Sequence, residues 1–368
     1  MKNERSRDWR RRTFVRGLSV GGAAAFLGLP DRGRSLGLLG SDDPAERSVI
    51  RSAAAELPLE TTTIRLIRAW DPGSTPKIPV LCMAPQLLAE ELLRAEGFTD
   101  IRYVDREGGL PSFRALAAGE GDLSVGQTLT FITQLDVGAP IVLLTGLHVG
   151  CYELFGTGSV RSIRDLKGKT VSIAAFGAGP HLLLAAMAAY VGLDLNRDIH
   201  WVALPSAESM RLLAEGKIDG FMGYPPEPQE LRAKKIGHVI VNTITDRPWS
   251  RYFCCSIAGN REFVRNHPVA AKRAVRAILK TADLCAREPE RAARLLTEKG
   301  YAVPLDSALE NVKQVPYGMW RNYDPEDTVR FYSLRLHEVG LIKSTPQKIL
   351  SQGTDWRILK ELKKELKA

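Results

Sequence analysis

The sequence predicts a two-lobed α/β protein, and three observations support that prediction. The chain has 368 residues, which is too long for one small hydrophobic core. Its hydrophobic content of 44% and charged content of 25% are typical of an ordinary globular protein and disfavour disorder and a multi-span membrane protein. Short apolar strands alternate with helical segments, and this alternation starts a second time near residue 162.

The first alternating run extends from residue 62 to residue 149. Alternating β-branched residues predict a strand over 62–68, and Pro85 occupies a first-turn position before a helical pattern over 86–96. Further strands are expected at 101–105, 122–126 and 139–149, with helices at 111–118 and 127–135.

The second run starts after a charged turn at residue 162 and ends near residue 242. Strands are expected at 170–176, 200–204, 219–223 and 238–242, and helices at 180–191, 207–215 and 229–235. A last strand is expected at 253–259, and the remainder is mostly helical. This order predicts parallel sheets covered on both faces, and such sheets bind ligands at the carboxyl ends of their strands.

Charge and cysteine content exclude several kinds of function. The net charge is +9, but residues 1–55 hold 11 Lys/Arg and 6 Asp/Glu, which leaves only +4 for the rest. No long basic stripe with interleaved aromatic residues follows, so no nucleic acid is expected as a partner. The cysteines Cys82, Cys151, Cys254, Cys255 and Cys285 form no C-x-x-C pair and show no zinc spacing with histidine. We therefore expect buried thiols, no metal and no cofactor, with a single disulfide left open.

Residues 1–55 are predicted to be a twin-arginine export signal and linker. Arg11 and Arg12 are followed by Thr13-Phe14-Val15-Arg16, which resembles the signal's order of two arginines, any residue, phenylalanine, an aliphatic and a basic residue. The apolar run over 17–30 is too short and too rich in glycine for a stable membrane span. Cleavage is expected near Ala25 or Ala55, and the periplasm is the expected location, with the twin-arginine translocation machinery as a partner.

The glycines of Gly177-Ala178-Gly179 do not fit a nucleotide-binding loop. A dinucleotide fingerprint needs a third glycine three residues after the second, where this chain has Leu182, and the Gly-Lys-Ser/Thr of a P-loop is absent. Two interpretations stay open. The glycines either form a tight turn or let the backbone come close to a ligand. In the second case, the free amides near Pro180 would favour a ligand with a negative group.

Four segments in order resemble the SsuA/THI5-like (NMT1/THI5) family of bacterial solute-binding proteins. Residues 162–171 read SIRDLKGKTV, close to the family pattern S-I-x-D-L-K-G-K-x-V. Residues 119–123 and 216–220 are similar to its G-x-x-D-A, and residues 253–260 are similar to its return strand, where pyrimidine-related members also carry cysteines. The resemblance covers about residues 60–340.

The resemblance implies a type II periplasmic binding protein, with two α/β lobes joined by a two-strand hinge. Lobe one would comprise residues 62–149 plus 256–368 and lobe two residues 156–247, with hinge crossings near 150–155 and 248–255. It further implies a monomeric solute receptor for the membrane permease of an ABC importer. Such a receptor closes about its hinge over the solute and needs no catalytic residue, metal or cofactor.

Candidate ligand-binding residues lie in the loops after the strands and at the second crossing. They are Trp70, Gly126, Gln127, Thr128, Phe176, Gly177, Ala178, Gly179, His181, Trp201, Tyr224, Glu227, Arg251 and Cys254. A sulfonate or carboxylate would use the amides at 126–128 and 177–181, together with Arg251. An aromatic or pyrimidine-like solute would stack on Trp70, Trp201 or Tyr224, with Glu227 accepting from ring nitrogens. A planar organic solute carrying an acid combines both sets.

Two other functions remain open at this point. The same scaffold suits a periplasmic sensor or a partner-delivery protein, which would dock on something other than a permease. The resemblance also includes eukaryotic THI5-like pyrimidine synthases, which need a lysine that carries pyridoxal phosphate and a sacrificial histidine. The first half of lobe one offers only His148 and Lys77 for these roles, and an exported chain would lack a cytosolic cofactor supply.

Overall fold

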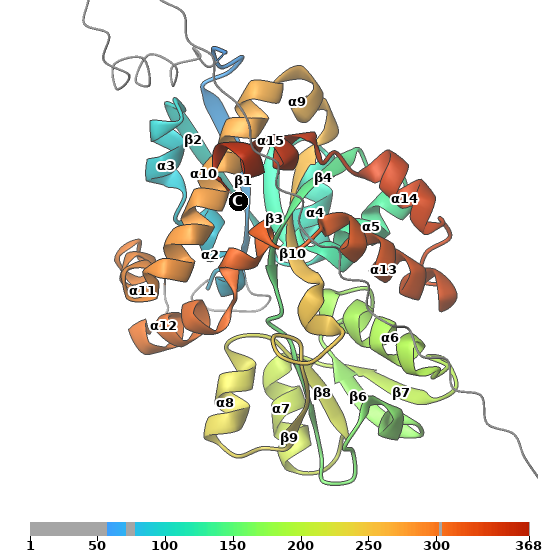
Figure 1. Ribbon diagram of the computed structural model, residues 1–368. Helices are drawn as coiled ribbons and strands as arrows, with labels where there is room; N and C mark the ends of the chain where they lie inside the picture. The colour runs from blue at the N-terminus through green and yellow to red at the C-terminus, as the bar shows by residue number, and fades with distance from the viewer. Residues whose placement is uncertain (1–56, 71–77, 302–303, 368) are drawn as a thin grey trace, which may run out of the picture. The chain divides into compact units, whose positions relative to one another are not determined.

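Two five-stranded sheets organise the chain in the computed structural model, which describes residues 57–70, 78–301 and 304–367 (Figure 1). The predicted export signal lies outside the described residues. The first sheet has the order β2-β1-β3-β10-β4 and the second the order β7-β6-β8-β5-β9. The strands of the first sheet are β1 (Thr63–Trp70), β2 (Asp100–Glu107), β3 (Leu123–Gln127), β4 (Ile141–Val149) and β10 (Phe253–Asn260). Those of the second are β5 (Glu153–Gly156), β6 (Lys169–Ile173), β7 (Ile199–Ala203), β8 (Gly220–Gly223) and β9 (His238–Asn242).

Each sheet contains one antiparallel strand, which corrects the expectation of purely parallel sheets. Strand β10 runs antiparallel to β3 and β4, and β5 runs antiparallel to β8 and β9. Both strands come directly after the chain has passed from one sheet to the other, so they enter their sheet without a crossover helix. Only crossover connections return a strand in the same direction. Strand β5 was not predicted; it begins inside the segment expected to be the first hinge crossing, at 150–155.

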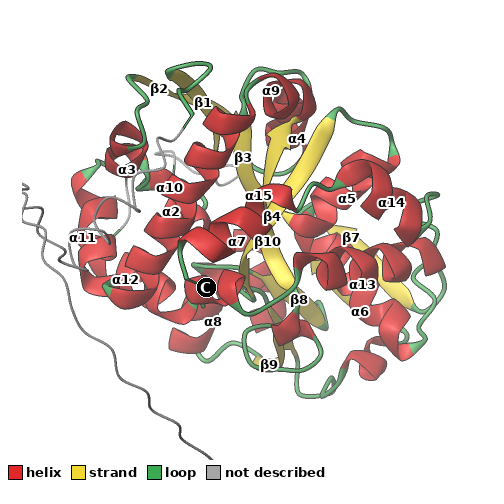
Figure 2. Ribbon diagram, turned by 45° about the horizontal axis from the view of Figure 1, so that its top comes forward, coloured by secondary structure: helices red, strands yellow, loops and turns green. Residues whose placement is uncertain are grey.

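Helices cover both faces of the sheets, and the α/β class predicted from the sequence is confirmed. Figure 1 shows α2, α3 and α10 on one side of the first sheet and α4 and α5 on the other, and Figure 2 shows the strands between these helices. The helices are α2 (Ala84–Leu87), α3 (Glu90–Ala95), α4 (Leu110–Ala117), α5 (Thr128–Asp136), α6 (Gly179–Val191), α7 (Ser206–Ala214), α8 (Glu227–Ala233), α9 (Arg261–Asn266), α10 (Pro268–Arg287), α11 (Pro289–Glu298), α12 (Leu305–Gln314), α13 (Pro325–Glu338), α14 (Pro346–Gly353) and α15 (Arg357–Glu365). Short 3₁₀ turns are η1 (Leu81–Met83), η2 (Ile163–Leu166), η3 (Trp249–Arg251) and η4 (Tyr317–Arg321). None of the described helices has the length and apolarity that crossing a membrane requires.

Two predicted elements differ from the structure. The helix expected over 86–96 is divided into α2 and α3. Within α2, the buried side-chain amide of Gln86 donates to the carbonyl of Ile67 at 2.7 Å and accepts from the backbone amide of Val125 at 2.8 Å, so it bonds to both β1 and β3. The strand expected over 170–176 ends at Ile173, and the exposed residues 174–176 form a loop instead.

Hydrogen bonds join the two segments where the chain passes between the sheets. The amide of Tyr152 donates to the hydroxyl of Thr243 at 2.9 Å, and the amide of Thr243 donates to the carbonyl of Tyr152 at 3.0 Å. Beside them, Gly150 has φ +68°, and a Cβ at this position would lie 2.4 Å from Cγ1 of Ile244. Only glycine combines that conformation with so close an approach.

The helix α13 also connects elements of the two sheets. The ring of Phe331 stacks on Tyr252 at a centroid distance of 4.0 Å and also contacts the rings of Trp249 and Tyr190. Tyr190 belongs to α6 of the second sheet, whereas Phe331 follows the last strand of the first. Trp249, Tyr252 and Phe331 pack in or against an apolar cluster that includes residues from both sheets. The lobe boundaries at 149, 156, 247 and 256 stay predictions.

Candidate functional site

A small cavity lies where the crossing segments meet the starts of α5 and α6. It is lined by Gln127, Leu129, Gly150, Tyr152, Gly179, Leu183, Thr243, Trp249, Tyr252, Cys254 and Tyr332. Its volume of ≈ 10 Å³ holds about one water molecule. An organic solute therefore enters only if the surrounding segments move apart.

Gln127 connects the first sheet to the crossing segment and to α6. It ends β3, and its side-chain amide donates to the hydroxyl of Tyr152 while its carbonyl accepts from Thr130 at 3.2 Å. The first residue of α6, Gly179, lies against the same side chain, because a Cβ there would lie 1.7 Å from Oε1 of Gln127. The glycine is thus required by close packing across the junction.

The first glycine of the predicted loop, Gly177, stabilises the conformation of the loop and does not contact the cavity. Gly177 has φ +77°, and its amide donates to Nδ1 of His181 at 3.1 Å. The His181 ring lies 5.3 Å from Phe176, which is 60% exposed, and 5.2 Å from Trp201. His181 therefore anchors the loop, and the amide of Gly177 is engaged by protein.

Burial lowers the pKa of His181 from its ordinary value of 6.5 to about 4. The neutral ring is the form that accepts from the amide of Gly177 through Nδ1. Between pH 4 and 6.5 the unfolded chain binds a proton here and the folded chain does not.

We expect the free energy of unfolding to fall as the pH drops from 6.5 to 4, by at most about 3 kcal/mol from this group. Urea unfolding at pH 7.0 and pH 4.5 measures the loss. The variant His181→Asn keeps an acceptor but cannot titrate, so it should lose less stability over the same interval. Equal losses in the two proteins would show that His181 carries a proton when folded.

Tyr224 and Glu227 form a compact turn after β8. The buried carboxylate of Glu227 accepts from the amide of Tyr224 at 2.8 Å, across the cis peptide between Pro225 and Pro226. The Tyr224 ring lies 5.8 Å from that of Tyr152, a residue of the cavity wall. Tyr224 is thus one ring away from the cavity, whereas Glu227 holds the start of α8.

Trp70 lies apart from this cavity. Its ring is 6.3 Å from that of Tyr301, and the guanidinium of Arg68 lies 4.8 Å above it. Trp201 is likewise engaged elsewhere, since its indole donates to the carbonyl of Leu195 at 2.9 Å. Both rings are half-buried by protein contacts.

The other predicted residues also include some that line the cavity and some that do not. The hydroxyl of Thr128 shares a buried hydrogen bond of 2.8 Å with Ser256, and Gly126 packs under the ring of Phe113. Arg251 is exposed in η3. Of the predicted set, Gln127, Gly179 and Cys254 line the cavity; Trp70, Gly126, Thr128, Phe176, Gly177, Ala178, His181, Trp201, Tyr224, Glu227 and Arg251 do not.

Four polar residues of the cavity wall are missing from the predicted set: Tyr152, Thr243, Tyr252 and Tyr332. Tyr152 and Tyr252 lie inside the predicted crossings at 150–155 and 248–255, and these positions were the available signal. Thr243 and Tyr332 carry no such signal, because α13 and the end of β9 reach the cavity only through tertiary packing.

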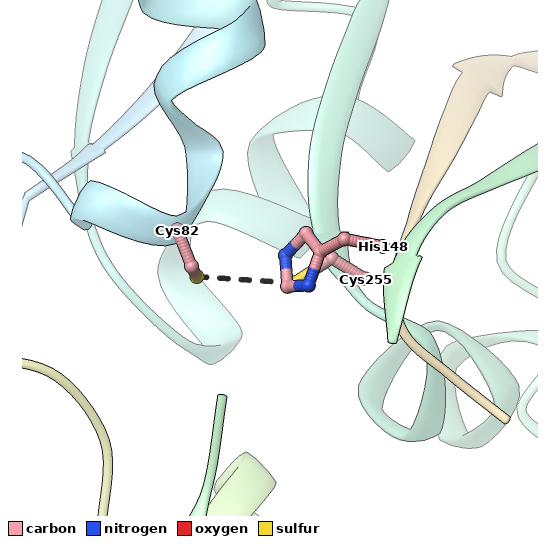
Figure 3. Close-up of side chains that lie close together, drawn as sticks. All are labelled: Cys82, His148 and Cys255. Carbon is pink, nitrogen blue, oxygen red and sulfur yellow. Dashed lines mark hydrogen bonds between the residues drawn. The ribbon is translucent and has the colours of Figure 1, made fainter. Parts of the chain in front are cut away.

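Four cysteines and a histidine gather next to the cavity. Cys82, His148 and Cys255 point toward one another (Figure 3), and the two sulfur atoms lie 4.0 Å apart. His148 also lies near Cys151 and Cys254, whose sulfur atoms are 3.1 Å apart. Contacts with the thiols of Cys151 and Cys255 hold the pKa of Cys82 well below its ordinary value.

Comparison with known proteins identifies the family and the fold. A model described as the NMT1-like family matches residues 78–297, and no curated protein matches. The nitrate-binding protein NrtA of Synechocystis PCC 6803 is 16% identical, with a TM-score of 0.65 over 84% of this chain and 90% of that chain. The putative sulfonate-binding protein SsuA of Methylobacillus flagellatus KT is 18% identical, with a TM-score of 0.64 over 83% and 94%. The aliphatic sulphonate binding protein SsuA of Escherichia coli is 16% identical, with a TM-score of 0.62 over 78% and 92%. These likenesses confirm the periplasmic binding protein fold.

Proposed function

Because this chain belongs to the NMT1-like family, we propose that it is the periplasmic solute-binding component of an ABC importer. Its two lobes would close over a small solute and present the closed form to a permease. Catalysis is not part of this function, so the solute would leave unchanged. The observation that carries the proposal is the contact of Gln127 with both Tyr152 and Gly179, which joins the first sheet to the crossing and to α6.

A small organic anion is the solute class that the site favours. The starts of α5 and α6 meet at the cavity, and the first amides of a helix attract negative groups. The rings of Tyr152 and Tyr252 add flat apolar surface for a planar body. The names of the similar structures, which bind nitrate or sulfonates, agree with an oxyanion.

A thermal-shift screen over sulfonates, aromatic acids and pyrimidines tests the proposal. A solute present at about 100 times its dissociation constant should stabilise the protein by about 2.7 kcal/mol. The recovered solute should have an unchanged mass. If no solute class stabilises the full chain, or if the solute is converted, the proposal is wrong.

We expect Tyr224→Ala to weaken the binding of an aromatic acid about fivefold. Closure would bring a planar solute between Tyr152 and Tyr224, and loss of one aromatic contact costs about 1 kcal/mol. Calorimetric titration of the variant measures this effect. Trp70→Ala provides the comparison, since its ring already packs on Tyr301. Unchanged affinity in both variants would contradict stacking as the means of recognition.

A further inference from the structure

The five clustered residues come from four different segments of the chain. Cys82 belongs to η1, His148 to β4, Cys151 to the first crossing, and Cys254 and Cys255 to β10. All five are buried, and we call them the cysteine–histidine cluster. Cys82 and Cys255 are 173 residues apart in sequence, so the cluster as a whole forms no local sequence motif.

An irregularity in β10 lets both of its cysteines join the cluster. Neighbouring side chains of a regular strand point to opposite faces. The pairing of β10 with β4 shifts register on both sides of Cys255, which pairs with His148. Cys254 therefore approaches Cys151 while Cys255 approaches Cys82.

The conformation of Cys151 supports a specific role for the cluster. Its φ is +108°, a region that L residues adopt only under strain. The strained backbone holds the sulfur of Cys151 beside that of Cys254, 103 residues further along the chain. A thiol that only filled space would not need this conformation.

One ring nitrogen of His148 makes no hydrogen bond of normal geometry within the described part of the chain. Its Nδ1 lies 3.3 Å from the carbonyl of Val149, and a carbonyl only accepts, so this bond requires the proton on Nδ1. Nε2 then carries a lone pair; it is buried, makes no hydrogen bond of normal geometry among the described residues, and interacts with the neighbouring thiol of Cys82. Buried polar atoms of this kind are rare and call for an explanation.

We propose that the cysteine–histidine cluster binds one thiophilic d¹⁰ cation, Zn²⁺ or Cu⁺. Cys82, His148 and Cys255 supply three ligands, and Cys151 or Cys254 supplies a fourth where the ion takes four. Each coordinating thiol releases its proton to solvent when the ion binds. Soft sulfur donors with imidazole select these ions over Mg²⁺ or Ca²⁺.

The distances fit such an ion. Zinc–sulfur bonds of about 2.3 Å in a tetrahedron place two sulfur atoms about 3.8 Å apart. The sulfur atoms of Cys82 and Cys255 are 4.0 Å apart. In each of the two triads that share His148, the ligand atoms lie within 4.8 Å of one another. Small side-chain shifts are enough to coordinate one ion.

The proposed ion would connect the cluster to the solute cavity. Cys254 lines the cavity, and Cys151 lies in the crossing segment beside Tyr152. A bound ion would fix this segment to η1, β4 and β10 of the first sheet. The site does not depend on the proposed transport function, because its ligands are defined without any solute.

The test uses the full chain, reduced and stripped of metal with a chelator. Zn²⁺ and, without oxygen, Cu⁺ are titrated separately, and bound metal is measured by mass spectrometry; Co²⁺ reports thiolate coordination through its absorption. We expect one equivalent per chain and a rise in melting temperature. Cys82→Ser and Cys255→Ser should weaken binding at least about 100-fold. Cys285→Ser, a buried cysteine outside the cluster, should bind as the wild type does.

Three outcomes would overturn the proposal. One is the absence of stoichiometric metal from the reduced wild-type chain. Another is equal binding by all three variants. The last is the formation of a Cys151–Cys254 disulfide in air, together with a reduced protein that shows no affinity for the metal. The Co²⁺ spectrum and melting temperature of the wild type keep the test valid if a serine variant fails to fold, and neither depends on finding the solute.

Discussion

Gly179→Leu is expected to abolish solute binding while the protein stays folded. A Cβ at this position would lie 1.7 Å from Oε1 and 2.2 Å from Cδ of Gln127, so a leucine displaces that side chain and holds α6 away from β3. The backbone of Gly179 is ordinary helix, which leucine tolerates. The solute-induced stabilisation should therefore fall from about 2.7 kcal/mol to near zero.

Thermal shift with the identified solute measures this effect, and Gly158→Leu is the matched control. Gly158 lies in the same half of the chain and has no positive φ, and a Cβ added there would meet no described atom within 4 Å. Its leucine variant should respond to solute as the wild type does. A full response from Gly179→Leu would show that the solute does not bind at the junction of β3 and α6.

Arg276→Met is expected to lower the free energy of unfolding by about 3–5 kcal/mol, because it removes one partner of a buried ion pair. The guanidinium of Arg276 on α10 donates to both carboxylate oxygens of Glu96 and also contacts Glu365. Both members of the pair are buried, and Lys280 would remain beside the Glu96 carboxylate at 3.1 Å. Urea unfolding at pH 7 measures the loss.

Two further variants distinguish the cost of leaving the Glu96 carboxylate buried without its partner from the cost of losing an arginine side chain. Arg330→Met removes an exposed pair with Glu326 and should cost less than about 1 kcal/mol. The double variant Glu96→Leu/Arg276→Met leaves no unpaired carboxylate at position 96 and should recover most of the loss. If Arg276→Met costs no more than Arg330→Met, the pair is not desolvated in solution.

The order and type of most elements were predictable because their signals are local. The run at 139–149 is mostly apolar and forms β4, whose nine residues are all buried. Proline near the first turn and glycine after the last turn correctly bounded α6. The short strand β5 and the direction of β10 were not predictable, since strand direction depends on how the chain crosses between sheets.

The residues of the candidate site also fall into those that local sequence signals predicted and those that tertiary packing decided. Gln127 and Gly179 were predicted because each follows a strand end, where α/β sheets bind ligands. Trp70 also ends a strand, but the structure packs its ring against Tyr301. Trp201 lies within β7, and its indole donates to Leu195. A strand end places a residue at the correct edge of a sheet, and the neighbouring elements decide whether its side chain faces the junction.

By itself, the sequence determined the α/β class, the two rounds of strand and helix, and the family resemblance, because side-chain period, turn residues and short motifs act over a few neighbouring positions. Only the tertiary structure decided that Gln127 meets Gly179 and that four cysteines from three segments of the chain gather near His148. Such contacts join segments as many as 173 residues apart, and their geometry is set by sheet order, by the register shift in β10 and by packing density.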